Sequence, residues 1–385
     1  MFGRMMNNYY YGKSGKGDFR KEDMPETRMQ LFRDTLRTRL SSLCRLNLIY
    51  MLIWLPAMIL IMLMIWNMAE TNAEDTVVKN SNYAEYCTIL QENSQEPRFS
   101  EEEFEYKKAF LEFMDMDYGT YVESMEEEGY EEIPGEAVFL QAREELKSRY
   151  YKTPLMKNLA LLALFIAITG PFTAGVCYVT RNWARDEHAF VWTDFKDAVK
   201  ANWKIPLVLS TITGLMPLIL YTGLDFYGTN TAGSLIWYIP IILLGMIGFI
   251  WTLGITYMHP LTVTYDLKLK DVIRNGFLLG IARLPFSIGI RLLHCVPALI
   301  CASASILFGL NFVIAIMILG GYYILIGFAL SRFITASYTN AVFDRYINQR
   351  IAGAKVNQGM KEPEDDDYED EDGEPDQAGG EPGKE

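Results

Sequence analysis

The sequence lacks the short motifs that commonly mark metal, redox and nucleotide sites. It has no CxxC pattern, no HExxH pattern and only three histidines, so a structural zinc site is not expected. Its five cysteines are scattered, and only Cys87 falls in a sizeable polar segment, which excludes a disulfide framework there. No glycine-rich phosphate loop follows a strand. We therefore expect no metal, no cofactor and no ATPase activity in this chain.

Acidic residues are missing from six long apolar runs. The first, "LIYMLIWLPAMILIMLMIW", carries no charge at all and is long enough to cross a hydrocarbon core of about 30 Å. About 47 residues precede it, and its apolar core exceeds the ~7–15 residues of a cleaved signal sequence. The runs predict an all-α polytopic membrane protein with about six transmembrane helices. They are Leu48–Trp66, Leu159–Val179, Ile205–Leu224, Leu235–Tyr257, Pro285–Phe308 and Phe312–Thr335.

Charge is distributed unevenly along the chain. Residues 69–154 carry 22 Asp and Glu against 8 Lys and Arg, whereas residues 1–46 carry 10 Lys and Arg against 5 Asp and Glu. Lys and Arg also recur in the connections 181–204 and 258–284, and they are absent from the other two short connections. Because positive loops stay on the cytoplasmic side, this pattern predicts both termini inside a plasma membrane. The net charge of −13 disfavours nucleic acid as a partner.

These patterns divide the chain into five parts. They are a cytoplasmic basic segment with an amphipathic helix (1–46), a first transmembrane helix (47–68), an acidic extracytoplasmic helical insertion (69–158), a membrane core of five transmembrane helices (159–346) and an acidic cytoplasmic tail (347–385). The tail is too polar to bury enough apolar surface, so we expect it to be disordered.

The basic segment has apolar residues at three- and four-residue steps, with arginines between them. They are Met29, Phe32, Leu36, Leu40 and Leu43. Two interpretations remain open: this helix lies on an anionic inner leaflet, or it packs against the protein's own cytoplasmic ends.

The acidic insertion contains helix signals of its own. Ser100 and Glu103 have the spacing of a capping box, and Phe104 and Leu111 follow on one side of the expected helix. Further along, Val138, Ala142, Leu146 and Tyr150 fall near one helical face. We expect a small helical subdomain here, which either captures a ligand or is simply a solvated insert.

The stretch "RDEHAFVWTDFKDAVKANWK" (185–204) separates two apolar runs. Trp192, Phe195, Val199 and Trp203 fall on one helical face, and Lys200 belongs to a basic face opposite. Thr193 is placed to cap this helix, with Asp194 favourably near its N-terminus. Trp and Lys are typical of the headgroup boundary, so the stretch predicts an interfacial helix.

A second copy of this arrangement follows. "FKDAVKANW" (195–203) aligns with "LKDVIRNGF" (269–277), which places Lys270, Asp271 and Arg274 in a second interfacial helix. Upstream, "TAGVCY" (173–178) matches "TLGITY" (252–257). A unit of span, inner helix and span therefore occurs twice in the same orientation. Such a parallel repeat relates the two halves by an axis along the membrane normal.

Three segments resemble the YesL family of bacterial membrane proteins: "RLNLIYMLIWLP" (45–56), "TGPFTAGVCYVTRNWARDEHAFVWTDFKDAVKANWK" (169–204) and "HPLTVTYDLKLKDVIRNGFLLGIARLP" (259–285). The family has no established molecular activity. The resemblance implies that this chain is a bacterial plasma-membrane protein associated with carbohydrate-uptake systems. The chain departs from the family pattern because about 110 residues separate Pro56 from Gly170, so its first two runs need not follow the family topology.

Candidates for a site inside the membrane are few. Arg291 and His294, three residues apart in the fifth run, could hold a polar or anionic ligand, although Arg291 could also snorkel and His294 could bond a neighbouring helix. Prolines and glycines in the runs most commonly produce simple kinks, but a broken helix would expose backbone groups to a substrate, and Gly170–Pro171 is the preferred position for such a break.

The remaining motifs do not support an enzyme. "DMDYGTYVESME" resembles a calcium loop, but Gly119 and Thr120 stand where a ligand and a glycine are needed. The many carboxylates of the insertion could supply a glycosidase pair, but nothing in the sequence fixes their separation. We therefore expect a non-catalytic membrane component that supports carbohydrate uptake or sensing, with the lipid bilayer and transporter subunits as partners. A permease for a small polar or sugar-like solute is the alternative, and a membrane-embedded enzyme is a distant third.

Overall fold

The computed structural model describes residues 24–230 and 234–361, and every regular element within them is helical. Nine of the described helices form the part rich in apolar runs: α2 (Arg28–Asn80), α7 (Thr153–Ala184), α8 (Val191–Ala201), α9 (Lys204–Asn230), α10 (Tyr238–Thr264), α11 (Leu269–Ala282), α12 (Leu284–Phe308), α13 (Phe312–Tyr322) and α14 (Phe328–Tyr346). A π-helical turn, η4 (Tyr323–Gly327), joins α13 to α14. The insertion adds α3 (Tyr83–Glu92), α4 (Glu101–Asp115), α5 (Tyr118–Glu127), α6 (Glu136–Lys147) and η2 (Ser148–Lys152). The short turns η3 (Leu235–Trp237) and η5 (Asn348–Arg350) complete the chain.

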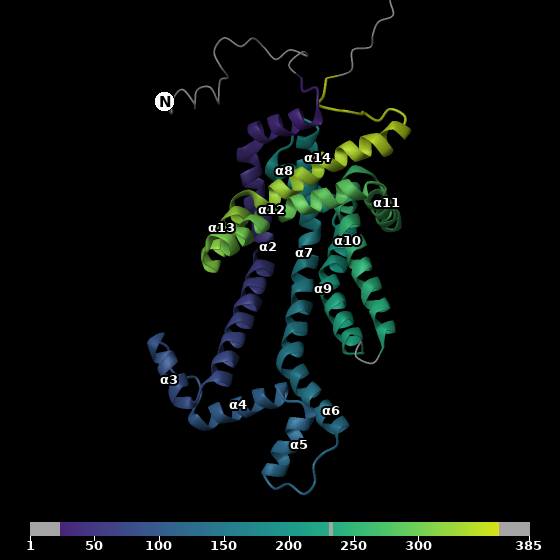
Figure 1. Ribbon diagram of the computed structural model, residues 1–385. Helices are drawn as coiled ribbons and strands as arrows, with labels where there is room; N and C mark the ends of the chain where they lie inside the picture. The colour runs from purple at the N-terminus through teal and green to yellow at the C-terminus, as the bar shows by residue number, and fades with distance from the viewer. Residues whose placement is uncertain (1–23, 231–233, 362–385) are drawn as a thin grey trace, which may run out of the picture.

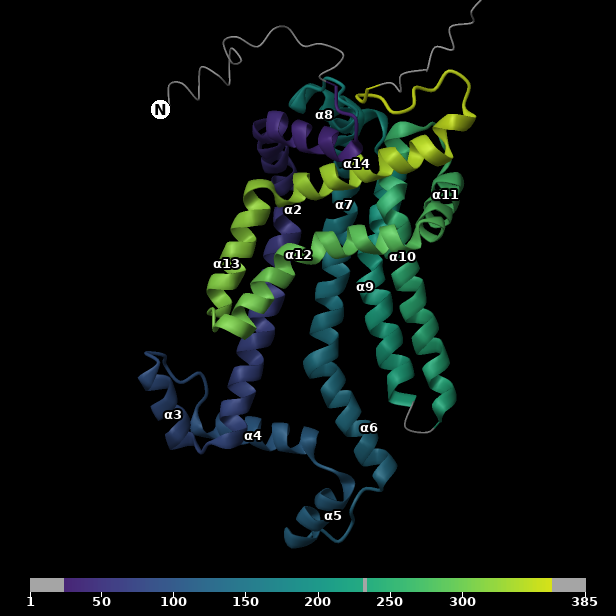
Figure 2. The same cartoon turned by 45° about the horizontal axis from the view of Figure 1, so that its top comes forward.

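Six helical segments within the described residues are long and apolar enough to cross a membrane, which confirms an all-α polytopic fold. In Figures 1 and 2, α2, α7, α9 and α10 run along a common direction. The fifth and sixth apolar runs behave differently, because α12 and α14 run across that direction in both views. The insertion lies at the far end of α2 and α7. We call this the insertion end of the bundle and the opposite one the terminal end.

Both ends of the described chain meet at the terminal end. The backbone N–H of Lys361 donates to the carbonyl oxygen of Pro25 over 3.0 Å. Arg28 at the start of α2 forms an ion pair with Asp344 near the end of α14. The first and last described residues therefore lie together at the terminal end. The last residues of the expected acidic tail, 362–385, lie outside the described residues.

The basic amphipathic segment and the first apolar run form one continuous helix, α2, with Pro56 inside it. Near its start, the ring of Phe32 stacks on Phe333 of α14 with 5.1 Å between ring centroids. Leu43 is buried, whereas Met29 and Leu40 are exposed. Of the two interpretations, packing against the protein itself therefore describes Phe32 and Leu43, and only part of the apolar face is left free for a membrane surface.

The insertion is a small helical subdomain, as expected. The capping box is confirmed: the backbone N–H of Ser100 donates to the Glu103 carboxylate, and that of Glu103 donates to the Ser100 hydroxyl. Phe104 and Leu111 are fully buried beside Val78 of α2. The expected apolar face of 138–150 is wrong in one respect, because Val138 is exposed and Phe139 is the buried residue of α6. Phe139 stacks on Tyr121 of α5, which rotates the buried face by one residue.

Gly170 and Pro171 do not break a helix, so the broken-helix alternative is wrong. α7 is a single helix with Pro171 inside it. A Cβ atom added to Gly170 would lie 2.3 Å from the carbonyl oxygen of Pro206, and one added to Gly214 would lie 2.7 Å from that of Ala163. The glycines of α7 and α9 therefore allow close backbone approach, which is how small residues pack membrane helices.

The sixth apolar run is not one regular helix either. At η4 the hydrogen-bond pattern changes to the π-helical one, and the chain turns from α13 into α14 (Figure 2). Asn47 of α2 compensates for the altered backbone pairing: its Nδ2 donates to the carbonyl oxygens of Tyr323 and Ile324, and its Oδ1 accepts from the N–H of Ala329. This fully buried asparagine thereby fastens the corner to the first span.

Candidate functional site

The two inner helices, α8 and α11, lie at the terminal end, each seated on a glycine of the preceding span. A Cβ on Gly175 of α7 would lie 2.6 Å from the ring of Phe195, and one on Gly254 of α10 would lie 2.8 Å from the ring of Phe277. These glycines occupy the same position in the repeated "TAGVCY" and "TLGITY" segments. The aromatic partners are not equivalent, since Phe195 begins its motif and Phe277 ends its own. In both units, therefore, a glycine of the span contacts a phenylalanine of the inner helix. The position of that phenylalanine within the repeated motif differs between the two units.

Helix α8 differs in detail from its sequence prediction. Its N-cap is Phe190, not Thr193, and the carboxylate of Asp194 accepts from the N–H of Phe190 over 2.8 Å. Phe195 is buried, while Trp192 is 61% exposed, so the two do not form one buried face. α8 ends at Ala201, which places Trp203 beyond the helix. Trp192 and Trp203 keep the exposure expected of residues at a headgroup boundary.

The basic residues of both inner helices face outward. Lys200 of α8 and Lys270 and Arg274 of α11 are exposed, and Asp271 lies in the first turn of α11, where a carboxylate favours the helix dipole. This surface can attract anionic lipid headgroups or an acidic partner.

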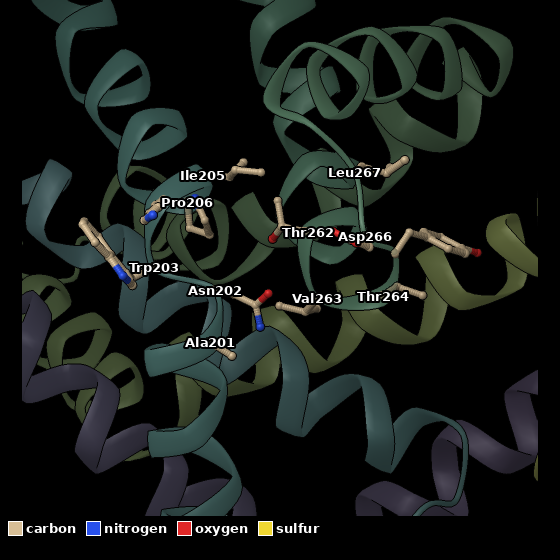
Figure 3. Close-up of a pocket in the computed structure, with 12 residues that line it drawn as sticks. Ala201, Asn202, Trp203, Ile205, Pro206, Thr262, Val263, Thr264, Asp266 and Leu267 are labelled. Atoms are coloured by element: carbon tan, nitrogen blue, oxygen red, sulfur yellow. The ribbon is translucent and has the colours of Figure 1, made fainter.

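A cavity of about 550 Å³ opens between the two units at this end (Figure 3). One wall is the passage from α8 to α9, residues 201–206, and the other is the passage from α10 to α11, residues 262–267. In Figure 3 the side chain of Asn202 projects between these walls toward Val263. The lining includes Asn202, Lys204 and Asp266, so the cavity is suited to a polar group from a partner or a solute.

Arg291 and His294 of α12 lie among further basic side chains. Hydrogen bonds join the helices that carry Arg332 (α14) and His259 (α10) to α12: the hydroxyl of Tyr257 in α10 bonds both Ser287 of α12 and Tyr338 of α14. The Oγ1 atom of Thr335 lies 3.4 Å from Nε2 of His294. We call these four residues, Arg291, His294, Arg332 and His259, the basic cluster.

Two members of the basic cluster were missed from the sequence. Arg332 lies inside the sixth apolar run, and the presence of a charge there was the available signal. His259 lies two residues beyond the fourth run, in the segment assigned to a loop. It is buried in α10, at 3% exposure. Gly170 and Pro171 do not belong to this cluster, since they serve the contact between α7 and α9.

A second pocket, of about 330 Å³, lies at the insertion end between α2 and α7. Its lining combines aromatic rings, amide groups and apolar side chains: Met64, Ile65, Asn67, Met68, Thr71, Asn72, Tyr150, Tyr151, Pro154, Leu155, Asn158 and Tyr221. Its size falls within the range of small-molecule sites. We call it the tyrosine–asparagine pocket.

Asp75 of α2 holds two tyrosines of this pocket in place. Its carboxylate accepts from the hydroxyl of Tyr150 over 3.0 Å and from that of Tyr151 over 2.9 Å. Lys107 of α4 forms an ion pair with the same carboxylate at 3.0 Å. Burial lowers the pKa of Lys107, but its bonds to Tyr150 and Asp75 outweigh that effect, so its pKa is raised overall. This network couples the insertion to the pocket.

Among the described residues, no group of three or more His, Cys, Asp or Glu side chains is arranged to hold a metal ion. In the stretch that resembles a calcium loop, Asp117 caps α5 by accepting from the N–H of Thr120 over 2.9 Å. That bond accounts for the acidic residue there and lowers the pKa of Asp117.

Comparison with known proteins gives one match. Residues 151–224, which span α7, α8 and most of α9, match the model of a protein family described as "Protein of unknown function, DUF624". No curated protein and no solved structure matches the chain. The similarity therefore covers the first unit of span, inner helix and span, in a family whose function is unknown.

Proposed function

We propose that this chain is a non-catalytic component of the bacterial plasma membrane that supports carbohydrate uptake or sensing, with both termini in the cytoplasm. The tyrosine–asparagine pocket carries this proposal. With that orientation, the pocket opens at the outer membrane surface, where a sugar arrives.

The lining of the pocket has the chemistry of a neutral sugar site. Rings of Tyr150, Tyr151 and Tyr221 offer apolar faces to the C–H groups of a pyranose, and the hydroxyl of Tyr221 offers a polar edge. Amides of Asn67, Asn72 and Asn158 can both donate to and accept from sugar hydroxyls. Asp75 is occupied by the two tyrosines, so it orients the aromatic groups rather than charging the pocket.

Equilibrium dialysis of the full-length chain in detergent, with radiolabelled glucose, galactose, xylose and maltose, tests the proposal. At least one sugar should bind, and Tyr221→Ala should weaken its binding by roughly tenfold through loss of ring contact. Tyr106→Ala is the matched control, because Tyr106 is an exposed tyrosine of α4 that does not line the pocket. Absence of sugar binding, or equal binding by both variants, would contradict the assignment.

A supporting role also requires a partner. Mild crosslinking of the tagged chain in its native membrane, followed by mass spectrometry, should recover subunits of a sugar transporter. Recovery should survive truncation of residues 362–385, because the contact is proposed to lie in the membrane part. Failure to recover any reproducible transporter subunit would count against the supporting role while leaving sugar binding untouched.

A permease is the second candidate, favoured by the charged side chains of Arg291 and Arg332 within apolar helices. It predicts that the purified chain alone moves labelled sugar across a vesicle membrane. Transport by the single chain would replace the supporting role with a direct one.

A further inference from the structure

The basic cluster brings together four side chains from three helices. Arg291 and His294 come from α12, Arg332 from α14 and His259 from α10. In Figure 2, α12 and α14 both run across α7 and α10, and Tyr257 of α10 bonds Ser287 of α12 and Tyr338 of α14. The cluster is remote from the tyrosine–asparagine pocket, which α2 and α7 form at the insertion end.

No acidic side chain of these helices balances the two arginines. Neither α10 nor residues 284–343 contain Asp or Glu. Asp344 is the first acidic residue of α14, and it follows Arg332 by twelve positions, or about 18 Å along a helix. It is already engaged, since it pairs with Arg28 and accepts from the N–H of Asn357. Two guanidinium charges in apolar helices without a carboxylate are costly.

Polar atoms within the cluster also lack hydrogen bonds. Nδ1 of His259 and Nε of Arg291 are both buried and have no hydrogen-bond partner in the described chain. Such buried groups cost free energy unless something pairs with them. His259 is 3% exposed, so bulk water does not supply a partner for its ring.

We propose that the basic cluster binds one oxyanion group, a carboxylate or a phosphate, held by Arg291 and Arg332 with His259 and His294 beside it. Guanidinium groups match carboxylate and phosphate geometry with paired N–H donors. Thr335, next to His294, supplies a hydroxyl at the edge of the site. The oxyanion belongs either to an acidic solute or to the headgroup of an anionic lipid.

Thermal unfolding of the full-length chain in phosphatidylcholine nanodiscs tests this site. For a solute, sodium glucuronate or inorganic phosphate should raise Tm, by about 5 °C at roughly a hundred times Kd. Glucose and sodium chloride of equal ionic strength are the matched controls and should not. For a lipid headgroup, nanodiscs containing phosphatidylglycerol should raise Tm, and the soluble anions should add little.

Variants locate the effect. Arg332→Gln should abolish the anion-dependent rise in Tm. Arg332→Lys keeps the positive charge but lacks the paired N–H donors of a guanidinium group, so it should bind the anion about tenfold more weakly. Arg274→Gln is the control, because Arg274 is an exposed arginine of α11 outside the cluster. The proposal is overturned if neither soluble anion nor anionic lipid raises Tm of the unmodified chain. This measurement does not depend on the folding of any variant. It is equally overturned if Arg332→Gln responds like Arg274→Gln. Either result leaves sugar binding at the insertion end unaffected.

Discussion

α9 and α12 close the two units of span, inner helix and span, and they are held in different ways. α9 lies along α7 so closely that Gly170 has no room for a Cβ atom. α12 crosses the bundle, and among its residues, all of them described, only Ser287 is buried. Its Gly289 has no atom within 4 Å of an added Cβ. The two units have similar inner helices, but the first ends in the tightly packed α9 and the second in the largely exposed α12.

This difference shows what the repeated motif determines. Gly175 and Gly254 seat α8 and α11 in both units, so the motif accounts for the span and its inner helix. It does not determine where the next span goes. Small residues at helix interfaces supply that information in the first unit, and α12 has no counterpart of the contact between Gly214 and Ala163. The family match at residues 151–224 covers the tightly packed unit.

The largest expected effect comes from filling the α7–α9 contact. Gly170→Leu places a side chain against the backbone of Pro206, so the helices must separate, at a cost of about 3 kcal/mol or more. Gly289→Leu is the matched substitution in α12 and should change stability by less than about 1 kcal/mol. Thermal unfolding of both detergent-solubilised variants measures the contrast. Equal losses would remove the distinction between the two closing spans.

The next effect concerns η4, the π-helical turn between α13 and α14. Asn47→Leu leaves the carbonyls of Tyr323 and Ile324 and the N–H of Ala329 without their present partner. Each buried unpaired group costs about 1–3 kcal/mol, although relaxation of the π-helical turn should recover part of it. Hydrogen exchange followed by mass spectrometry should show faster exchange in residues 312–330. Unchanged exchange there would mean that Asn47 does not hold the corner.

A smaller effect is expected at the buried point of α12. Ser287 bonds the hydroxyl of Tyr257 over 2.6 Å, and Tyr257 in turn bonds Tyr338 of α14 over 2.8 Å. Ser287→Ala removes this bond and the one that the Ser287 hydroxyl donates to the carbonyl oxygen of Arg283, and it should cost about 1–2 kcal/mol. Exchange in α12 should accelerate while exchange in α9 stays constant. Acceleration in both helices would show that the two spans are coupled rather than independently held.

The smallest effect lies in the insertion, which contacts α2 and α7 rather than α12. Hydrogen bonds from the backbone and side chain of Ser100 lower the pKa of Glu103. Its contribution is therefore complete above the unfolded pKa near 4.5 and is lost as pH falls through the lower folded value. Limited proteolysis of α4 should accelerate slightly on acidification. Glu103→Gln keeps an acceptor without a titrating charge, so its proteolysis should lose this pH response.

Local features could be predicted from the sequence. Long apolar runs predict helices because every backbone N–H and C=O group inside a membrane must form a hydrogen bond within the protein. The capping box at Ser100 depends only on two residues three positions apart. The second inner helix was found by its internal match. In each case the information lies within a short stretch of chain.

Non-local features could not be predicted in the same way. A Gly-Pro pair has the same sequence whether it breaks a helix or meets another backbone, so the role of Gly170 required the position of α9. The crossing of α12 and α14 arises from tertiary packing and has no periodic signature. Arg332 differs, because its charge was visible in the sixth run and only its neighbours His259 and Arg291 needed the fold.

The bonds of Asn47 to η4 and α14 have a consequence for biosynthesis. Asn47 and Ala329 are separated by 282 residues. At a translation rate of about 5–20 residues per second, roughly 15 to 55 s pass between synthesis of the two. During that interval the first helix to emerge has a buried amide and no native partner for it. An insertion factor or membrane chaperone that shields polar groups would have to shield this helix for the longest time. Depletion of such a factor should therefore impair the insertion of α2 first.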